Sequence, residues 1–144
     1  NIWIKLLEKV EKSVLWLLEI NESSKNNLIK EANTRGIKKE RLVFAKRTSH
    51  DKYLAQFKYA DLYLDTFIYN AGATASNALW MGLPVLTMAG NSYSARMANS
   101  LLNSLGLNEL ITYSKQDYED LALKLSTDKK MLNSIKLKLK DNIP

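Results

Sequence analysis

The chain has 144 residues, of which 46% are hydrophobic and 25% charged, and its formal net charge is +6. This size and composition fit one globular domain with a sizeable core and exclude a disordered chain. The sequence has no cysteine and one histidine, which excludes disulfide scaffolds, cysteine-ligated zinc, thiol catalysis and two-histidine metal motifs. No apolar run reaches the ~20 residues of a membrane span and no secretory signal opens the chain, so a cytoplasmic protein is expected.

The first residues predict an amphipathic helix that has no clear beginning. Ile2, Trp3, Leu6, Leu7 and Val10 recur with the spacing of one helical face. Neither an initiator methionine nor a capping residue precedes them. We therefore expect the sequence to be a piece of a longer protein.

Short apolar runs alternate with amphipathic segments along the rest of the chain. The runs predict strands at residues 13–18, 41–45, 61–64, 85–88 and 109–112, the first of them covered on both faces. Helices are predicted at residues 23–35, 49–59, 74–81 and 92–105, and two closing helices at 115–125 and 128–141. This alternation is typical of βαβ units, so the expected fold is α/β: a single doubly wound, Rossmann-like domain with a mostly parallel sheet.

Polar residues and glycines mark the expected ends of these helices. The predicted N-caps are Ser23 or Ser24, Thr48 or Ser49, Ser114 and Thr127. The predicted helix stops are Gly36, Gly82 and Gly106.

The segment after the third predicted strand has the clearest chemical signature. Residues 71–76 are all small and lie where the next helix should begin. The first amides of a helix have no partner within it, and together with the helix dipole they favour an anion such as a phosphate. The hydroxyl of Thr74 could add a hydrogen bond, and Asn77 could reach a neighbouring sugar hydroxyl. The alternative is that the small residues only permit close packing of the helix on the sheet.

Two other strand ends carry polar residues without a readable catalytic group. Tyr53 and Gln56 lie one turn apart and could face a common cleft or be half-exposed, and His50 fits a capping or surface position better than a catalytic base. Arg96 could pair with a buried carboxylate, for which Asp65 is a plausible partner, or with the cleft, and a structural ion pair is favoured over a catalytic role. Neither a GxGxxG loop, a P-loop nor a Ser–His–Asp arrangement is present, which disfavours nicotinamide cofactors and P-loop chemistry.

Several runs of the sequence resemble one known family. The O-GlcNAc transferase and SPINDLY-like glycosyltransferases are resembled by residues 60–71 (ADLYLDTFIYNA), 74–87 (TASNALWMGLPVLT) and 90–96. The opening SVLWLL, residues 106–111 and the run Tyr118-Glu119-Asp120 are similar as well. The resemblance implies a GT-B fold of two Rossmann-like halves, usually preceded by tetratricopeptide repeats. Residues 1–144 would be the C-terminal half, a domain that binds the nucleotide-sugar donor.

The resemblance also implies an activity. Such enzymes transfer a sugar to protein side chains with inversion, typically GlcNAc from UDP-GlcNAc to Ser or Thr, without a cofactor or metal. Some relatives use GDP-fucose or modify Asn, so the nucleotide, sugar and acceptor stay open. The implied partners are a nucleotide sugar, an acceptor protein and the upstream half of the same chain, with no nucleic acid and no transmembrane segment.

The family's donor-binding roles carry over to eight positions. The backbone near Thr48 would meet the base, with His50 beside the base and ribose, and Tyr53 and Gln56 would line the uracil pocket. The diphosphate and ribose contacts would come from Gly72, Ala73, Thr74 and Asn77.

Four of these positions depart from the family pattern, and the catalytic base would lie outside this chain. The family loop commonly reads His-Thr-Thr where this sequence has Gly72-Ala73-Thr74. A common acid is Asn77 here, and a usual histidine is Tyr53. Backbone amides would therefore carry more of the diphosphate contact.

A different class of function starts from the basic C-terminal segment. Residues 128–144 hold five lysines against two aspartates. The alternative is a non-catalytic interaction module whose basic closing helix docks on an acidic partner or a membrane surface.

Overall fold

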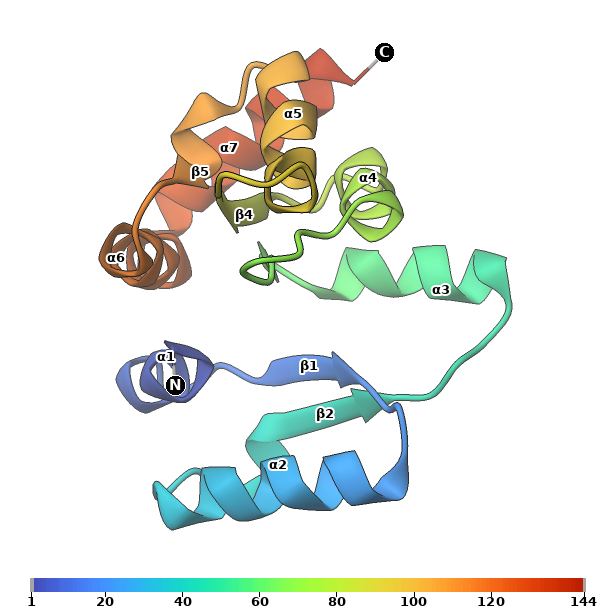
Figure 1. Cartoon of the computed structure of the whole chain (residues 1–144), viewed down its shortest axis with the longest axis vertical. Coiled ribbons are helices and arrows are strands. Elements are labelled where there is room, and N and C mark those ends of the chain that lie inside the picture. Colours follow the sequence, from blue (N-terminus) through green and yellow to red (C-terminus); the bar gives the residue numbers. More distant parts are fainter. Residues whose placement is uncertain (1, 144) are drawn as a thin grey trace. The chain divides into compact units, whose positions relative to one another are not determined.

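Helices alternate with short parallel strands in two compact units over residues 2–143, the part that this computed structural model describes (Figure 1). The first unit runs to Tyr53 and the second begins at Leu54. The first contains α1 (Ile2–Lys9), β1 (Leu15–Leu18), α2 (Glu22–Thr34), the 3₁₀ helix η1 (Lys39–Arg41) and β2 (Leu42–Ala45), and α3 (His50–Gln56) spans the boundary. The second contains η2 (Phe57–Tyr59), β3 (Tyr63–Leu64), α4 (Ala73–Trp80), β4 (Val85–Met88), η3 (Ser94–Arg96), α5 (Met97–Ser104), η4 (Asn108–Leu110), β5 (Ile111–Thr112), α6 (Lys115–Thr127) and α7 (Lys129–Asn142).

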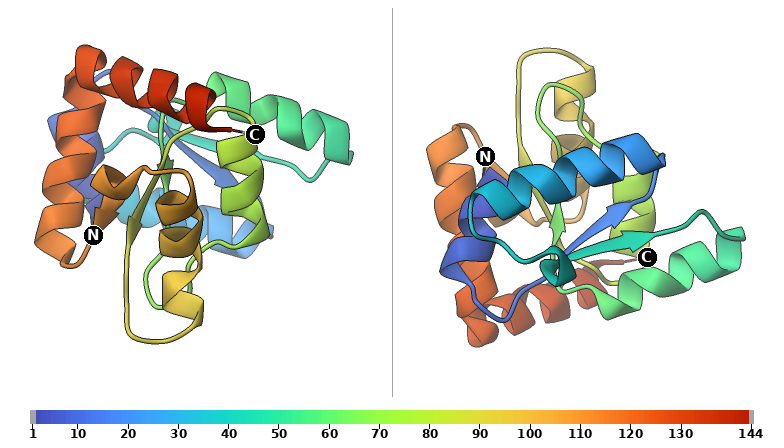
Figure 2. Two further views of the ribbon diagram at one scale, coloured as in Figure 1. Left: turned by 90° about the horizontal axis from the view of Figure 1, so that it is seen from above. Right: turned by 90° about the horizontal axis from the view of Figure 1, so that it is seen from below.

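The first unit is a pair of parallel strands with α2 packed along one face (Figure 2). The two strands pair from Leu15 opposite Leu42 to Leu18 opposite Ala45. The buried core of this unit consists of Leu7, Ala32, Ile37 and Leu42. Helices α1 and α2 therefore share one apolar layer with the strand pair.

The expectation that residues 13–18 form a strand covered on both faces is wrong. The strand begins at Leu15, and its burial alternates: Trp16 and Leu18 are 36% and 52% exposed, whereas Leu15 and Leu17 are half-buried. Successive side chains of a strand point to opposite faces, and in this unit α2 covers one of them. A continuous apolar run does not by itself show that both faces are buried.

One arginine ties the end of α1 to the start of β1. The Arg41 Nε donates to the carbonyl of Ser13 at 2.6 Å, and its Nη2 donates to the carbonyls of Leu7 and Val10, both at 2.8 Å. Carbonyls at the C-terminal end of a helix have no partner within it. The guanidinium therefore acts as a C-cap for α1, supplied from a position 31 to 34 residues further along the chain.

In the second unit, β4 is the middle strand of a three-stranded parallel sheet. Tyr63 of β3 lies opposite Val85, and Ile111 of β5 lies opposite Thr87 on the other side of β4. The core gathers around this strand and reaches α4, α5 and the adjoining helices α6 and α7 (Figure 2). Its fully buried members include Ala75, Ala78, Val85, Leu102, Leu107, Leu110 and Leu139.

The expected α/β class, with parallel strands and closing helices, is confirmed. The strand at residues 85–88 lies where it is predicted, and Gly36, Gly82 and Gly106 adopt positive φ angles of 76°, 80° and 63° after α2, α4 and α5. Three other predicted elements are shorter because 3₁₀ helices occupy part of them: residues 49–59, 92–105 and 109–112. That residues 1–144 form one domain stays a prediction.

Two of the predicted N-caps are wrong. The Oδ1 of Asn21 accepts from the amide of Ser24 at 2.8 Å, so Asn21 caps α2. Asp128 caps α7 by accepting from the amide of Met131 at 3.0 Å. Thr127 lies instead in the last turn of α6, where its hydroxyl donates back to the carbonyl of Leu123. The cap of α6 at Ser114 is confirmed.

Among the helices of residues 2–143, none combines the length and hydropathy of a membrane-spanning segment.

We expect Arg41→Met to lower the free energy of unfolding by about 1–3 kcal/mol, because backbone carbonyls at the end of α1 lose their donor. Chemical denaturation followed by circular dichroism measures the change. Arg35→Met, which removes a surface ion pair with Glu31, is the matched control and should cost less than about 0.5 kcal/mol. An Arg41 effect no larger than that of the control would contradict the capping role.

Candidate functional site

Helix α4 begins without a capping side chain. Gly72 precedes it, and the carbonyl of Gly72 accepts from the amide of Ser76 at 3.0 Å. The amides of Ala73, Thr74 and Ala75 donate to no group within residues 2–143. Unpaired first-turn amides and the positive end of the helix dipole together favour an anion.

The start of α4 is open at one residue and closely packed at its neighbour. Ala73 is exposed and Thr74 is half-buried. A Cβ atom on Gly72 would lie 2.5 Å from Cε of Met97, so this side chain from α5 fills the space next to Gly72. Close packing and unpaired amides, the two alternatives expected for residues 71–76, thus occur together at this helix start.

A buried carboxylate holds the loop that leads into α4. Oδ1 of Asp65 accepts from the amides of Thr66 and Ala71, both at 2.8 Å, and Oδ2 accepts from the hydroxyl of Thr87 at 2.7 Å. The hydroxyl of Tyr118 donates to the backbone carbonyl of Asp65 at 2.9 Å. Asp65 is 1% exposed, so a single side chain ties β3, β4 and the start of α4 together inside the protein.

The expected ion pair between Arg96 and Asp65 is wrong. Within residues 2–143, the Asp65 carboxylate accepts hydrogen bonds from two amides and one hydroxyl, all of them uncharged. Hydrogen bonds of this kind can satisfy a buried carboxylate without a cation. Arg96 lies instead at the start of α5 and lines a separate pocket next to Ala89.

Burial shifts the pKa values of both groups in this network. Desolvation raises the pKa of Asp65 above its ordinary value, although the hydrogen bonds from Ala71, Thr87 and Thr66 oppose the shift. Burial also raises the pKa of Tyr118 far above its usual range, and the charge of Asp65 adds to that effect. Tyr118 therefore stays protonated and remains a donor at any ordinary pH.

The loop between Asp65 and α4 contains a strained residue. Ile68 has a φ of 71°, a left-handed conformation that is unfavourable for a β-branched side chain. The hydroxyl of Thr66 donates to the carbonyl of Tyr69 at 2.7 Å, and the amide of Asn70 donates to the carbonyl of Ser94 at 2.9 Å. These bonds hold a conformation in which Ile68 and Tyr69 are 84% and 69% exposed.

The other predicted site residues lie on or just before α3. Thr48 is exposed in the loop after β2, and His50 is the exposed first residue of α3. The rings of His50 and Tyr53 are 6.2 Å apart between centroids, and Gln56 ends the same helix as a half-buried residue. Tyr53 and Gln56 are three residues apart, so they share one face of α3 as expected.

Asn77 lies one turn into α4. It is half-buried, and its side-chain amide has no partner among the described residues. The structure thus brings Gly72, Ala73, Thr74 and Asn77 together on the first two turns of one helix.

Sequence reasoning missed three residues that shape this site. Asn70 is fully buried and donates to the carbonyl of Thr66 at 2.9 Å, Thr87 binds Asp65, and Tyr118 reaches it from α6, 53 positions along the chain. A threonine inside the apolar run of residues 85–88 was the one available signal, because a buried hydroxyl needs a partner.

We expect the stability difference between Asp65→Asn and the wild type to depend on pH. A raised folded-state pKa means that the stabilising contribution of protonated Asp65 is complete below about pH 3.8 and is lost as the pH rises through the folded-state value. Asparagine cannot ionise, so the variant should gain stability relative to the wild type as the pH rises across that window.

Urea denaturation between about pH 3.5 and pH 7 measures this difference. Asp141→Asn, which removes an exposed carboxylate from α7, controls for the loss of one negative charge. A difference between Asp65→Asn and the wild type that stays constant with pH would show that ionisation of Asp65 is not coupled to folding.

Known proteins resemble this chain over nearly its whole length. The UDP-N-acetylglucosamine–peptide N-acetylglucosaminyltransferase of Caenorhabditis elegans is 34% identical over 139 residues, which are 96% of this chain and 12% of that protein. The SPINDLY protein of Oryza sativa subsp. japonica is 35% identical over 92 residues, which are 64% of this chain and 10% of that protein. The chain thus spans a small part of the length of these relatives.

A solved structure and a family model agree with these relatives. A mutant of the O-GlcNAc transferase from Thermobaculum terrenum matches with a TM-score of 0.92 and 30% identity, covering 98% of this chain and 28% of that chain. The model of Glycosyl transferase family 41 matches residues 1–143. The chain therefore belongs to glycosyl transferase family 41.

Proposed function

We propose that this chain is the donor-binding part of an inverting protein glycosyltransferase. The expected reaction transfers GlcNAc from UDP-GlcNAc to Ser or Thr of an acceptor protein. The observation that carries the proposal is the start of α4, where the amides of Ala73, Thr74 and Ala75 are unpaired next to small side chains. The reaction binds the donor through its diphosphate and releases a nucleoside diphosphate, so it needs an anion site of this kind.

The names of the relatives support this choice of reaction. The protein from Caenorhabditis elegans is named for the transfer of N-acetylglucosamine from UDP to peptide, and the matching solved structure is an O-GlcNAc transferase. These proteins are longer than this chain, so the proposal includes an upstream GT-B half that supplies the catalytic base. Tetratricopeptide repeats preceding that half belong to the same proposal.

The contribution of α4 to the reaction would be electrostatic. When the bond between sugar and phosphate breaks, negative charge accumulates on the leaving nucleoside diphosphate. Fixed amides and the helix dipole stabilise that charge without having to reorganise during the reaction. Thr74 would add a hydroxyl donor, and the side-chain amide of Asn77, one turn further along α4, would bind a ribose hydroxyl. Thr48, His50, Tyr53 and Gln56 would contact the base.

The departures from the family pattern shift this site towards neutral contacts. With Gly72 and Tyr53 at two positions where histidine is usual, the site relies on backbone donors for the diphosphate. Asn77 in place of an acid gives an uncharged hydrogen bond to ribose, which is weaker than a charge-assisted one. We therefore expect donor affinity to depend strongly on the amides at the start of α4.

The structure gives less support to an interaction module with a basic docking helix. On α7, Lys136 pairs with Asp61 at 3.0 Å and Lys138 pairs with Glu109 at 2.8 Å. Both acids belong to the same unit as α7, so part of the lysine charge is already balanced within it. The charge available for an acidic partner or a membrane is smaller than the composition indicates.

Titration of the chain with UDP, followed by NMR of the backbone amides, tests the proposal. We expect the amide signals of Ala73, Thr74 and Ala75 to shift, and GDP measured in parallel shows which nucleotide binds more tightly. The absence of any shift in α4 with either nucleotide would overturn the proposal.

We expect Ala73→Glu to abolish UDP binding without lowering stability. A carboxylate in the first turn of a helix is favourable by about 0.3–1 kcal/mol, whereas the same charge repels a diphosphate. The NMR titration and thermal denaturation measure the two effects. Asn133→Glu, an exposed position of α7, adds the same charge elsewhere and should leave UDP binding unchanged. Equal UDP affinity of Ala73→Glu and the wild type would show that the diphosphate does not bind at α4.

A further inference from the structure

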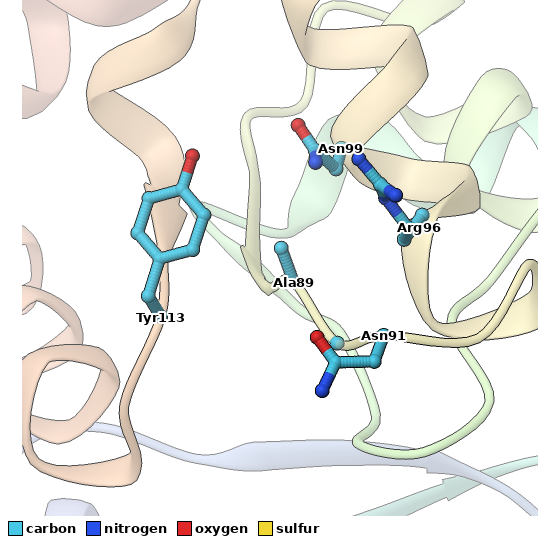
Figure 3. A pocket seen from close by; sticks show the side chains of 6 residues that line it. Ala89, Asn91, Arg96, Asn99 and Tyr113 are labelled. Atoms are coloured by element: carbon cyan, nitrogen blue, oxygen red, sulfur yellow. The ribbon is translucent and has the colours of Figure 1, made fainter.

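A polar pocket lies beyond the carboxyl ends of β4 and β5 (Figure 3). Its volume is about 250 Å³. Its lining consists of Ala89, Gly90, Asn91, Arg96, Asn99 and Tyr113, all from the second unit. None of these residues belongs to the start of α4, so the pocket is separate from the diphosphate site proposed above.

Arg96 brings the only charge among the lining residues. It has no ion pair or side-chain hydrogen bond within residues 2–143, and no carboxylate lines the pocket. Figure 3 shows its guanidinium directed towards Asn99. An arginine beside a pocket without an acid is available to an external anion.

A tight turn fixes the position of this arginine. The amide of Gly90 donates to the carbonyl of Ala95 at 2.8 Å, and the amide of Ala95 donates to the hydroxyl of Ser92 at 3.2 Å. A Cβ atom on Gly90 would lie 2.7 Å from Cβ of Ala95, so only glycine permits this close approach. The turn therefore holds the residue next to Ala95, which is Arg96, beside the loop that follows β4.

The remaining polar groups of the pocket are neutral donors. The Oδ1 of Asn99 accepts from Nδ2 of Asn103 at 2.6 Å, which leaves the Nδ2 of Asn99 free to donate. Asn91 and the hydroxyl of Tyr113 have no side-chain partner among the described residues, and Tyr113 is 74% exposed. One cation with two amides and a phenol gives the pocket one positive charge and several donors.

We propose that this pocket binds a single carboxylate group. A guanidinium matches a carboxylate through two parallel hydrogen bonds, and the neutral donors can satisfy its remaining lone pairs. A phosphate monoester carries a charge of about −1.5 to −2 at neutral pH, which one arginine balances less well. The carboxylate belongs either to a small free monocarboxylic acid or to an acidic side chain of a peptide.

NMR titrations of the chain with butyrate and with a capped Gly-Glu-Gly peptide, each of which carries one carboxylate, test the proposal. We expect the amide signals of Gly90, Asn91, Asn99 and Tyr113 to shift with at least one of them. Binding of butyrate alone identifies a free acid as the source, and tighter binding of the peptide identifies a side chain. Equal shifts at the same amides with inorganic phosphate or sulfate would overturn the proposal, because they would show nonspecific attraction of anions. The absence of shifts with both carboxylates would overturn it as well.

Arg96→Gln should weaken carboxylate binding about tenfold or more, since it removes the charge and the paired donors. Arg96→Lys keeps the positive charge but loses the paired donors of the guanidinium. Its carboxylate affinity should therefore lie between those of the wild type and Arg96→Gln. Arg35→Gln removes a surface arginine from α2 and is the matched control, with unchanged binding expected. Tyr113→Phe, at an exposed position, gives a second variant and should weaken binding severalfold. Unchanged affinity in both Arg96→Gln and Tyr113→Phe would contradict the assignment.

Because UDP is titrated separately, the two proposals can fail independently. Loss of carboxylate binding in Arg96→Gln with UDP binding intact would show that the pocket and the start of α4 are distinct sites.

Discussion

The second unit depends on the hydrogen bonds of one buried carboxylate, that of Asp65. These bonds lie at the edge of the sheet where the parallel strands end. The two oxygens of Asp65 bind Thr66, Ala71 and Thr87, and thereby join one strand to its neighbour and to the loop before α4. A carboxylate inside a protein is costly unless its lone pairs are satisfied. Here the hydrogen bonds that satisfy it are also the bonds that fix the loop, so stability and site geometry have a common origin.

Parallel strands place both candidate sites at the same edge of this sheet. The start of α4 follows β3, and the pocket around Arg96 follows β4 and β5. In open parallel sheets, ligands bind beyond the carboxyl ends of the strands, where loops lead into helices. The contact between the carbonyl of Ser94 and the amide of Asn70 joins the two loops concerned. The proposed diphosphate site and the proposed carboxylate site are therefore built from adjacent loops at one edge of the sheet.

Local patterns in the sequence predict strands and helix ends better than they predict which side chains form hydrogen bonds with each other. The strand at residues 85–88 and the glycine stops lie where they were expected, because hydrophobic runs and positive φ angles are local properties. The partner of Asp65 was mispredicted, since choosing the nearest cation ignores amides and a hydroxyl that only the fold brings together. Likewise, the small residues at 71–76 indicated the open amides of α4, but nothing near them revealed the contribution of Tyr118.

The contact between Gly72 and Met97 constrains how this chain could change. The methyl group of Met97 occupies the place that any larger residue at position 72 would need. The histidine of the usual family loop could be introduced at position 72 only if the Met97 side chain adopts another rotamer or is replaced by a smaller residue. We therefore expect relatives that carry an imidazole at position 72 to have a smaller or differently oriented side chain at position 97.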